Sequence, residues 1–222
     1  MKESGQGIVQ KLQVLFAKRP ELRFISHHDL MRTFQRALRR AGIPVRMTGG
    51  FNPRPRIVLP HALEVGISSE YEYAEIELAE WMPPAEFARR VSAALPAGLP
   101  VREVRLLPPR KRCSVAVEAH YDAQLDAEEA RAASSGIEGF LAAESWPVER
   151  TKHDGSKRNV DLRPHVAGLS MDGRALSLRL RLGKPGAARP REVIAAVLGR
   201  PGEAMLNIEL RKTRTVLSGP TR

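Results

Sequence analysis

Apolar residues recur along this chain at two different spacings, which together predict alternating helices and strands. Residues 26–41 carry them every three or four positions, so the apolar side chains gather on one face of a helix. In residues 73–78 and 175–182, apolar and polar positions alternate, which is typical of strands with one buried face. Comparable patterns predict the remaining elements, which are strands at 11–17, 22–24, 57–65, 99–107, 114–121 and 206–217, helices at 83–95, 126–143 and 190–198, and a hairpin at 148–162.

The order of these elements predicts an α+β protein made of two similar halves. The first half reads strand, helix, two strands, helix, strand, which is the order of a split βαβ or ferredoxin-like unit. A basic, proline-rich run at 108–112 separates it from a second half in which the order repeats, with the hairpin as an insertion. We therefore predict tandem ferredoxin-like halves with antiparallel sheets, an N-terminal half at 10–108 and a C-terminal half at 109–217. Chance similarity between two small α+β patterns is the alternative.

The helix at 26–41 has clear signals at both ends. Ser26 is a residue type that caps helices, and Asp29 follows three positions later to face the free amides of the first turn. Gly42 supplies a C-terminal stop. The following segment, with Gly49-Gly50 and two prolines within 52–56, cannot continue regular structure because each proline lacks an amide donor. We expect it to be a stiff, extended loop.

Positive charge is concentrated on the polar face of this helix and in the loop after it. Residues 18–60 contain ten Lys or Arg and two acids, whereas residues 61–108 contain four basic and eight acidic residues. The arginines of the predicted surface are Arg32, Arg36, Arg39, Arg40, Arg46, Arg54 and Arg56. Their guanidinium groups can bridge phosphate oxygens, and Phe51 between them can stack on an unpaired base. This pattern predicts an RNA-binding surface; a solvated helix face with Phe51 as a core anchor is the alternative.

A second basic group surrounds the Asp154-Gly155 turn of the predicted hairpin. It consists of Arg150, Lys152, His153, Lys157 and Arg158. These side chains can contact the same RNA strand as the first group, since clustered like charges often form interaction surfaces. An ordinary exposed hairpin explains the pattern equally well.

The overall charge agrees with an acidic partner. The formal net charge is +11 and the pI is near 10.5, which favours RNA, DNA or an anionic protein surface. A compositional bias toward arginine is the competing explanation for the total charge, although it does not explain the clustering. No apolar run is long enough to cross a bilayer, and no segment of secretory type precedes the first strand, so we expect no membrane partner and a cytoplasmic protein.

The cysteine content limits the cofactors that this chain can hold. Cys113 is its single cysteine, which excludes an internal disulfide and a cysteine-ligated zinc or iron–sulfur site built from this chain alone. The basic residues before Cys113 favour a thiolate, whereas burial in the following strand would make the thiol inert, and we expect the inert form. We expect no cofactor and no metal.

His27 and His28 offer an alternative chemistry. Imidazole titrates near neutral pH, so the pair could remove a proton from a 2′-hydroxyl and supply one to the leaving group, as in a metal-independent RNA-processing ribonuclease. Enzymes with tandem ferredoxin-like folds invite this comparison by analogy. A histidine at a helix N-terminus more often caps or packs, and the helix dipole there lowers its basicity.

Three segments of the chain resemble a known family. They are RFISHHDL at 23–30, GFNPRPR at 50–56 and VDLRP at 160–164. They are similar to the radical-SAM-linked protein family of unknown function, whose members are free-standing or form the C-terminal domain of cobalamin-binding radical SAM proteins. The resemblance implies an accessory module beside a radical SAM enzyme that carries its own iron–sulfur cluster. The family has no agreed catalytic residues, and the second histidine of SHHD departs from the SHLD that relatives often carry.

Together these observations predict a basic, non-catalytic RNA-binding accessory module that acts with a radical SAM enzyme in RNA modification or processing. Two alternatives stay open. One is the ribonuclease that uses His27 or His28, and the other is a protein-interaction module whose basic face meets an acidic partner.

Overall fold

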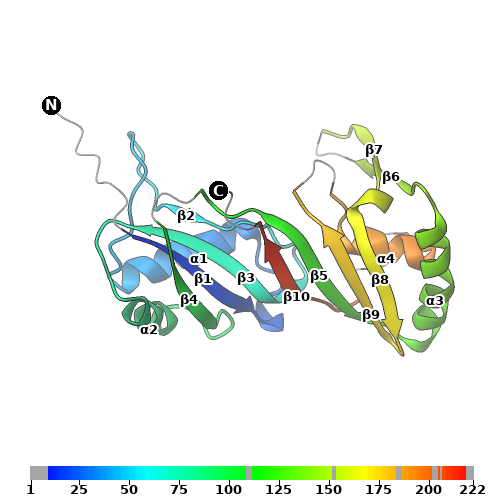
Figure 1. The fold of residues 1–222 in the computed structure, drawn as a ribbon, viewed down its shortest axis with the longest axis horizontal. Coiled ribbons are helices and arrows are strands. Elements are labelled where there is room, and N and C mark those ends of the chain that lie inside the picture. Colours follow the sequence, from blue (N-terminus) through cyan, green and yellow to red (C-terminus); the bar gives the residue numbers. More distant parts are fainter. Residues whose placement is uncertain are drawn as a thin grey trace. The chain divides into compact units, whose positions relative to one another are not determined.

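The protein has a mixed α+β fold, which we describe from a computed structural model (Figure 1). The structure describes residues 10–108, 112–151, 154–183, 187–201, 205 and 207–218. The chain divides into two compact units, the first formed by residues up to Val115 together with those from Ser218 onward, and the second by Ala116–Leu217. Within each unit the paired strands are antiparallel. No helix in the described part of the chain is long and apolar enough to cross a membrane.

The first unit is a sheet covered by two helices. Its elements are β1 (Gln10–Lys18), the 3₁₀ helix η1 (Pro20–Leu22), α1 (His27–Arg40), β2 (Ile57–Val58), β3 (Ile67–Leu78), α2 (Pro84–Ala94) and β4 (Val101–Leu107). The strands lie in the order β4–β1–β3–β2. Buried side chains of α1, α2, β1 and β3 form one apolar core, in which the rings of Phe16 and Phe34 meet edge to face at 4.8 Å. Both helices therefore cover the same face of the sheet.

The predicted helix at 26–41 is confirmed by α1. The hydroxyl oxygen of Ser26 accepts a hydrogen bond from the backbone N–H of Asp29 at 3.1 Å, which satisfies one of the free amides of the first turn. Gly42 follows the helix with a φ of 61°, a left-handed conformation that glycine adopts without strain. Both boundaries are set by local interactions, which explains why the sequence predicts them well.

Three predicted strand boundaries in this unit are wrong. The strand predicted at 22–24 is absent, because Pro20 begins the short helix η1 there. The strand predicted at 57–65 is the two-residue β2, and the strand predicted at 73–78 is the second part of β3, which begins at Ile67. The first part of β3 buries polar side chains such as Ser69 and Glu72, so its sequence shows no clean alternation.

The second unit repeats this arrangement with an inserted hairpin. Its elements are β5 (Ala116–Gln124), α3 (Ala127–Ala142), β6 (Pro147–Thr151), β7 (Lys157–Asp161), the 3₁₀ helix η2 (Arg163–His165), β8 (Val166–Asp172), β9 (Ala175–Arg181), α4 (Pro190–Leu198) and β10 (Leu210–Leu217). The main strands lie in the order β10–β5–β9–β8, while β6 and β7 form a separate two-stranded sheet. The predicted helices, the hairpin and the strand at 175–182 are confirmed. Strand β8 was not predicted from the sequence, and Leu206, the first residue of the predicted last strand, lies outside the described residues.

Candidate nucleic-acid interface

The sequence pattern of α1 separates its apolar and basic side chains onto different faces. Leu30, Phe34 and Leu38 are buried in the core. The arginines at 32, 36, 39 and 40 are all exposed, since they fall between the buried positions of the 3.6-residue repeat. The helix therefore presents a basic ridge to solvent.

The loop after α1, residues 46–56, is referred to below as the arginine loop. The backbone N–H of Thr48 donates to the carbonyl of Arg54 at 2.8 Å, and the N–H of Arg54 donates to the Thr48 hydroxyl oxygen at 2.9 Å. The N–H of Arg56 donates to the carbonyl of Arg46 at 2.8 Å. These bonds close the base of a narrow arm, drawn in light blue in Figure 1. At its tip Phe51 has a relative exposure of 111%, so it is not the core anchor of the alternative interpretation.

Three hollows surround α1 within the first unit. The first lies between α1 and α2 and has a volume of about 830 Å³. The second, of about 460 Å³, lies between α1 and the base of the arginine loop. The third, of about 370 Å³, is bounded by α1, the arginine loop, β2, β3 and Cys113. Arg36 lines the first two hollows, and Gln35 and Pro55 line the last two, so the three form one continuous band across the helix.

The arginines of this band differ in how far their charge is already neutralised. Arg46 forms an ion pair of 2.9 Å with Glu77, and both side chains are largely buried. Arg32 lies 3.6 Å from the exposed carboxylate of Asp29, a distance typical of a weak surface pair. Among the described residues, five other arginines of the band form no ion pair with a carboxylate; these are Arg36, Arg39, Arg40, Arg54 and Arg56, of which Arg40 is engaged with a backbone carbonyl instead. The prediction that Arg46 contacts RNA is therefore less well supported, because Glu77 already neutralises this side chain.

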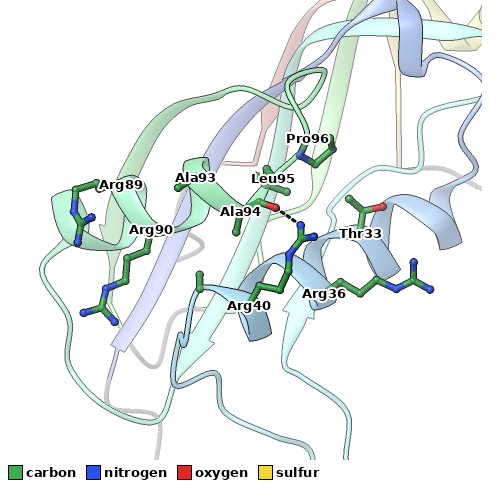
Figure 2. Close-up of a pocket in the computed structure, with 10 residues that line it drawn as sticks. Thr33, Arg36, Arg40, Arg89, Arg90, Ala93, Ala94, Leu95 and Pro96 are labelled. Carbon is green, nitrogen blue, oxygen red and sulfur yellow. Dashed lines mark hydrogen bonds between the residues drawn. The ribbon is translucent and has the colours of Figure 1, made fainter.

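The first hollow contains arginines from both helices of the unit (Figure 2). Arg40 donates a hydrogen bond to the carbonyl of Ala94, an end group of α2 that has no partner within its own helix. In Figure 2, Arg36 extends away from α2, whereas Arg89 and Arg90 project from it. Arg40 thus links the two helices, and Arg36 is left to face solvent.

Arg89 and Arg90 were not among the residues predicted from sequence. Both pair with Glu86, at 2.8 and 2.6 Å, and their hydrogen bonds lower the pKa of the Glu86 carboxyl to about 2. Their position between the buried Phe87 and Val91 indicates an exposed helix face, but only the packing of α2 beside α1 brings them to this surface. One carboxylate serves two arginines here, so the first hollow keeps an excess of positive charge.

A buried ion pair forms part of the third hollow. The Nζ of Lys11 lies 2.8 Å from a carboxylate oxygen of Glu75, and each of the two residues is 1% exposed. The Lys11 ammonium also donates to the sulfur of Cys113 at 3.5 Å, while the backbone N–H of Ser114 donates to Glu75 at 3.0 Å. Burial opposes both charges, but these bonds outweigh it, so the pKa of Lys11 is raised and that of Glu75 is lowered.

Comparison with known proteins places the chain in a family. Residues 11–196 match a family described as uncharacterized proteins conserved in bacteria, DUF2344. The chain belongs to this DUF2344 family. No protein with a curated description matches it.

Two solved structures are similar to this DUF2344 chain. A chain in the crystal structure of a Cbf5-Nop10-Gar1 complex is 14% identical with a TM-score of 0.46; the match covers 92% of this chain and 48% of that one. The DUF2344 chain thus spans about half the length of that chain. The crystal structure of an unknown protein from Galdieria sulphuraria is 11% identical with a TM-score of 0.25, over 93% of this chain and 98% of that one.

The two histidines of the DUF2344 chain lie at the start of α1. Their ring centroids are 6.0 Å apart, and His28 is exposed whereas His27 is half-buried. Burial lowers the pKa of His27, and the charge of His28 lowers it further. Neither lines the three hollows, and Asp29 accepts a hydrogen bond from the Ser26 hydroxyl at 2.8 Å. Among the described residues, no group of three or more His, Cys, Asp or Glu could hold a metal ion.

The second predicted basic group lies on the β6–β7 hairpin of the second unit. Arg150 donates to both carboxylate oxygens of Glu192 and to the carbonyl of Ala187, so it serves a structural role and is not a free cation. Lys157 pairs with Glu149 at 2.8 Å. Arg158 is exposed. Lys152 and His153 lie outside the described residues.

Proposed function

We propose that this protein is a non-catalytic RNA-binding module that acts beside a radical SAM enzyme in RNA modification or processing. The observation that carries the proposal is the band of hollows across α1, lined by Arg36, Arg39, Arg54 and Arg56, none of which is paired with a carboxylate among the described residues. Unpaired guanidinium groups on a concave surface suit the regularly spaced phosphates of a nucleic acid strand.

Single-stranded RNA fits this surface better than a duplex. The ring of Phe51 stands in solvent beyond the band, where an unpaired base can stack on it. Bases in a duplex are already stacked, and the deep groove of A-form RNA hides their edges from side chains. An RNA strand whose phosphates cross α1 and whose base reaches the arm would contact both the unpaired arginines and the ring of Phe51.

The finer description of the fold belongs to the same proposal. We infer that each unit is a variant of the ferredoxin-like fold, since the orders β4–β1–β3–β2 and β10–β5–β9–β8 place corresponding strands at corresponding positions. The radical SAM partnership is supported by the three sequence segments that resemble the radical-SAM-linked family. The single cysteine agrees with an iron–sulfur cluster that belongs to the partner.

The proposal predicts a specific change in the salt dependence of RNA binding. Replacing Arg36, Arg39, Arg54 and Arg56 by glutamine should make the slope of log K against log salt less steep, by roughly 0.7 for each phosphate of a single strand that is no longer neutralised. Fluorescence anisotropy of a labelled, unstructured oligoribonucleotide in rising KCl measures this slope.

The matched control replaces by glutamine four other exposed arginines that form no ion pair with a carboxylate among the described residues, and it gives the same net charge; these are Arg19, Arg131, Arg211 and Arg214. The control variant should keep most of the parent slope. An equal reduction of the slope in both variants would mean that total charge alone attracts RNA. No binding by the parent protein would leave the protein-interaction alternative, which co-purification of an acidic protein would support.

Phe51 provides an independent test of base stacking. Phe51→Ala should weaken binding of the same RNA by about 1–3 kcal/mol with an unchanged salt slope, because stacking on an aromatic ring contributes about this much per base and releases no counterions. The variant Phe51→Trp keeps a stacking surface and should bind as well as the parent. An alanine variant that binds RNA normally would exclude the arm from the interface.

The ribonuclease alternative has less support from the geometry. Neither His27 nor His28 lines the band where the phosphates would lie, and the lowered pKa of His27 makes it a poor proton donor near neutral pH. Cleavage of labelled RNA by the parent protein, lost in His27→Ala/His28→Ala, would favour this alternative.

A further inference from the structure

The third hollow has the properties of a site for a small molecule, in addition to its place beside the proposed RNA path. Its volume of about 370 Å³ lies within the range of roughly 300–1,000 Å³ that is typical of small-molecule pockets. Apolar side chains, including Met31, Ile57 and Val58, line part of its wall. Most of the remaining lining is polar and comes from five separate segments of the first unit.

Two of the positively charged side chains that line the third hollow have no carboxylate partner among the described residues. Both of its carboxylates are already engaged, Glu75 with Lys11 at 2.8 Å and Glu77 with Arg46 at 2.9 Å. The other two charged side chains that line it are Arg54 and Arg56, which form no ion pair with a carboxylate in the described part of the chain. Two positive charges are therefore left for a ligand.

The backbone holds these two arginines in place before any ligand arrives. The N–H of Arg54 is bonded to the Thr48 hydroxyl, and the carbonyl of Arg56 accepts from the N–H of Glu77 at 3.1 Å. Because Arg54 and Arg56 flank Pro55, which is fixed in φ, their side chains leave a stiff segment of chain. The two guanidinium groups can thus meet a single anionic group with little loss of backbone freedom.

We propose that the third hollow binds a phosphate monoester, with Arg54 and Arg56 on the phosphate and the apolar wall against the body of the ligand. A phosphate monoester carries a charge of about −1.5 to −2 at pH 7, which matches the two unpaired guanidinium groups. An internal phosphodiester of RNA carries one negative charge and offers two non-bridging oxygens, so it satisfies the pair less well. Two sources share the preferred chemistry, namely a free mononucleotide and the 5′-phosphate end of an RNA.

Calorimetric titration with AMP, with adenosine as the ligand control, tests the site directly. The parent protein should bind AMP and not adenosine. Arg54→Gln/Arg56→Gln should lose about 100-fold or more in AMP affinity, because both charged donors to the phosphate are removed. Both side chains are exposed, so circular dichroism should show an unchanged fold. Arg36→Gln/Arg39→Gln, on the other hollows, is the matched control and should bind AMP like the parent.

Cys113 gives a second readout of the same site. It is exposed and precedes β5, so the burial expected from the sequence was wrong; it lines the third hollow and is the single thiol of the chain. Bound AMP should slow its alkylation by iodoacetamide in the parent, and adenosine should not. The proposal would be overturned if AMP did not bind the parent or bound no better than adenosine. It would also be overturned if AMP bound equally well to the Arg54→Gln/Arg56→Gln variant.

Competition with RNA separates the two sources of the phosphate. A 5′-phosphorylated oligoribonucleotide that displaces AMP more than about tenfold better than its 5′-hydroxyl counterpart would assign the site to RNA ends. Equal displacement by the two oligonucleotides, with tight AMP binding, would assign it to a free mononucleotide. The inference does not depend on the proposed function, since AMP binding without retention of unphosphorylated RNA would support the site and contradict the RNA path across α1.

Discussion

Lys11→Met is expected to lower the free energy of unfolding of the first unit by about 3–5 kcal/mol, because it removes one partner of a buried ion pair. Glu75 is 1% exposed, and its carboxylate would be left with the Ser114 N–H and without a compensating charge. Methionine fills nearly the same volume as lysine, so a cavity contributes little. Urea unfolding monitored by Trp81 fluorescence in a Trp146→Phe background reports on this unit, since the two tryptophans lie in different units.

The double variant Lys11→Met/Glu75→Leu is the control for this prediction. It removes both charges and should recover most of the lost stability, because an apolar pair of similar volume costs no desolvation. A double variant as unstable as Lys11→Met would show that packing, and not the unpaired carboxylate, accounts for the loss.

The pH dependence of this pair has a defined sign. The pKa of Glu75 is lowered in the folded protein. Its contribution to the stability of the folded state is therefore present above its pKa in the unfolded chain, about 4.3, and is lost as pH falls through its pKa in the folded protein. The pKa of Lys11 is raised in the folded protein. Its contribution to stability is therefore present below its pKa in the unfolded chain, about 10.4, and is lost as pH rises through its pKa in the folded protein. The stability difference between parent and Lys11→Met should therefore narrow at acid pH, where Glu75 becomes protonated. A constant difference from about pH 7 to about pH 3 would contradict this explanation.

Gly136→Ala is expected to destabilise the second unit by about 3 kcal/mol or more, at the upper end of the usual cost of overpacking. A β carbon at this position of α3 would lie 1.8 Å from the backbone oxygen of Val197 in α4. A backbone atom cannot move aside as a flexible side chain can, so the two helices would have to separate. Urea unfolding monitored by Trp146 in a Trp81→Phe background follows this unit, because the Trp146 ring packs against Phe140 at 5.1 Å.

Gly139→Ala is the matched control on the same helix. Beyond the backbone of its own helix and its two chain neighbours, no atom lies within 4 Å of a β carbon there, so alanine should stabilise the helix by about 0.5–1 kcal/mol through its higher helix propensity. Changes of opposite sign in the free energy of unfolding for the two substitutions would establish that the close approach of α3 and α4 requires glycine at position 136. A similar loss of stability in both would point to a general intolerance of alanine in α3.

The sequence predicts elements well where local interactions define them. The capping of α1 by Ser26 and the capping box of Asp126 and Glu129 at α3 involve residues three positions apart, so both helix starts are visible in the sequence. Strand β8 is different, because its residues are partly buried without alternation and the side chain of Arg179 lies close to Gly168. No local pattern marks such a strand.

The candidate site could be predicted only in part, for a related reason. The basic ridge of α1 follows from helical spacing, but the neutralisation of Arg46 and Arg150 depends on carboxylates 31 and 42 residues away. The third hollow joins Lys11 to Cys113, which are 102 residues apart. Charge counting along the chain cannot show which arginines have a partner across the fold.

The closed base of the arginine loop has a consequence for how fast a partner can bind. Thr48 and Arg54 are linked by two hydrogen bonds, and Met47 pairs with Pro55, so the arm has lost much of its conformational entropy in the free protein. A partner that meets the arm does not have to wait for a segment to fold. The rate of association at the arm should therefore be set by diffusion and electrostatic steering, with selectivity expressed mainly in the lifetime of the complex.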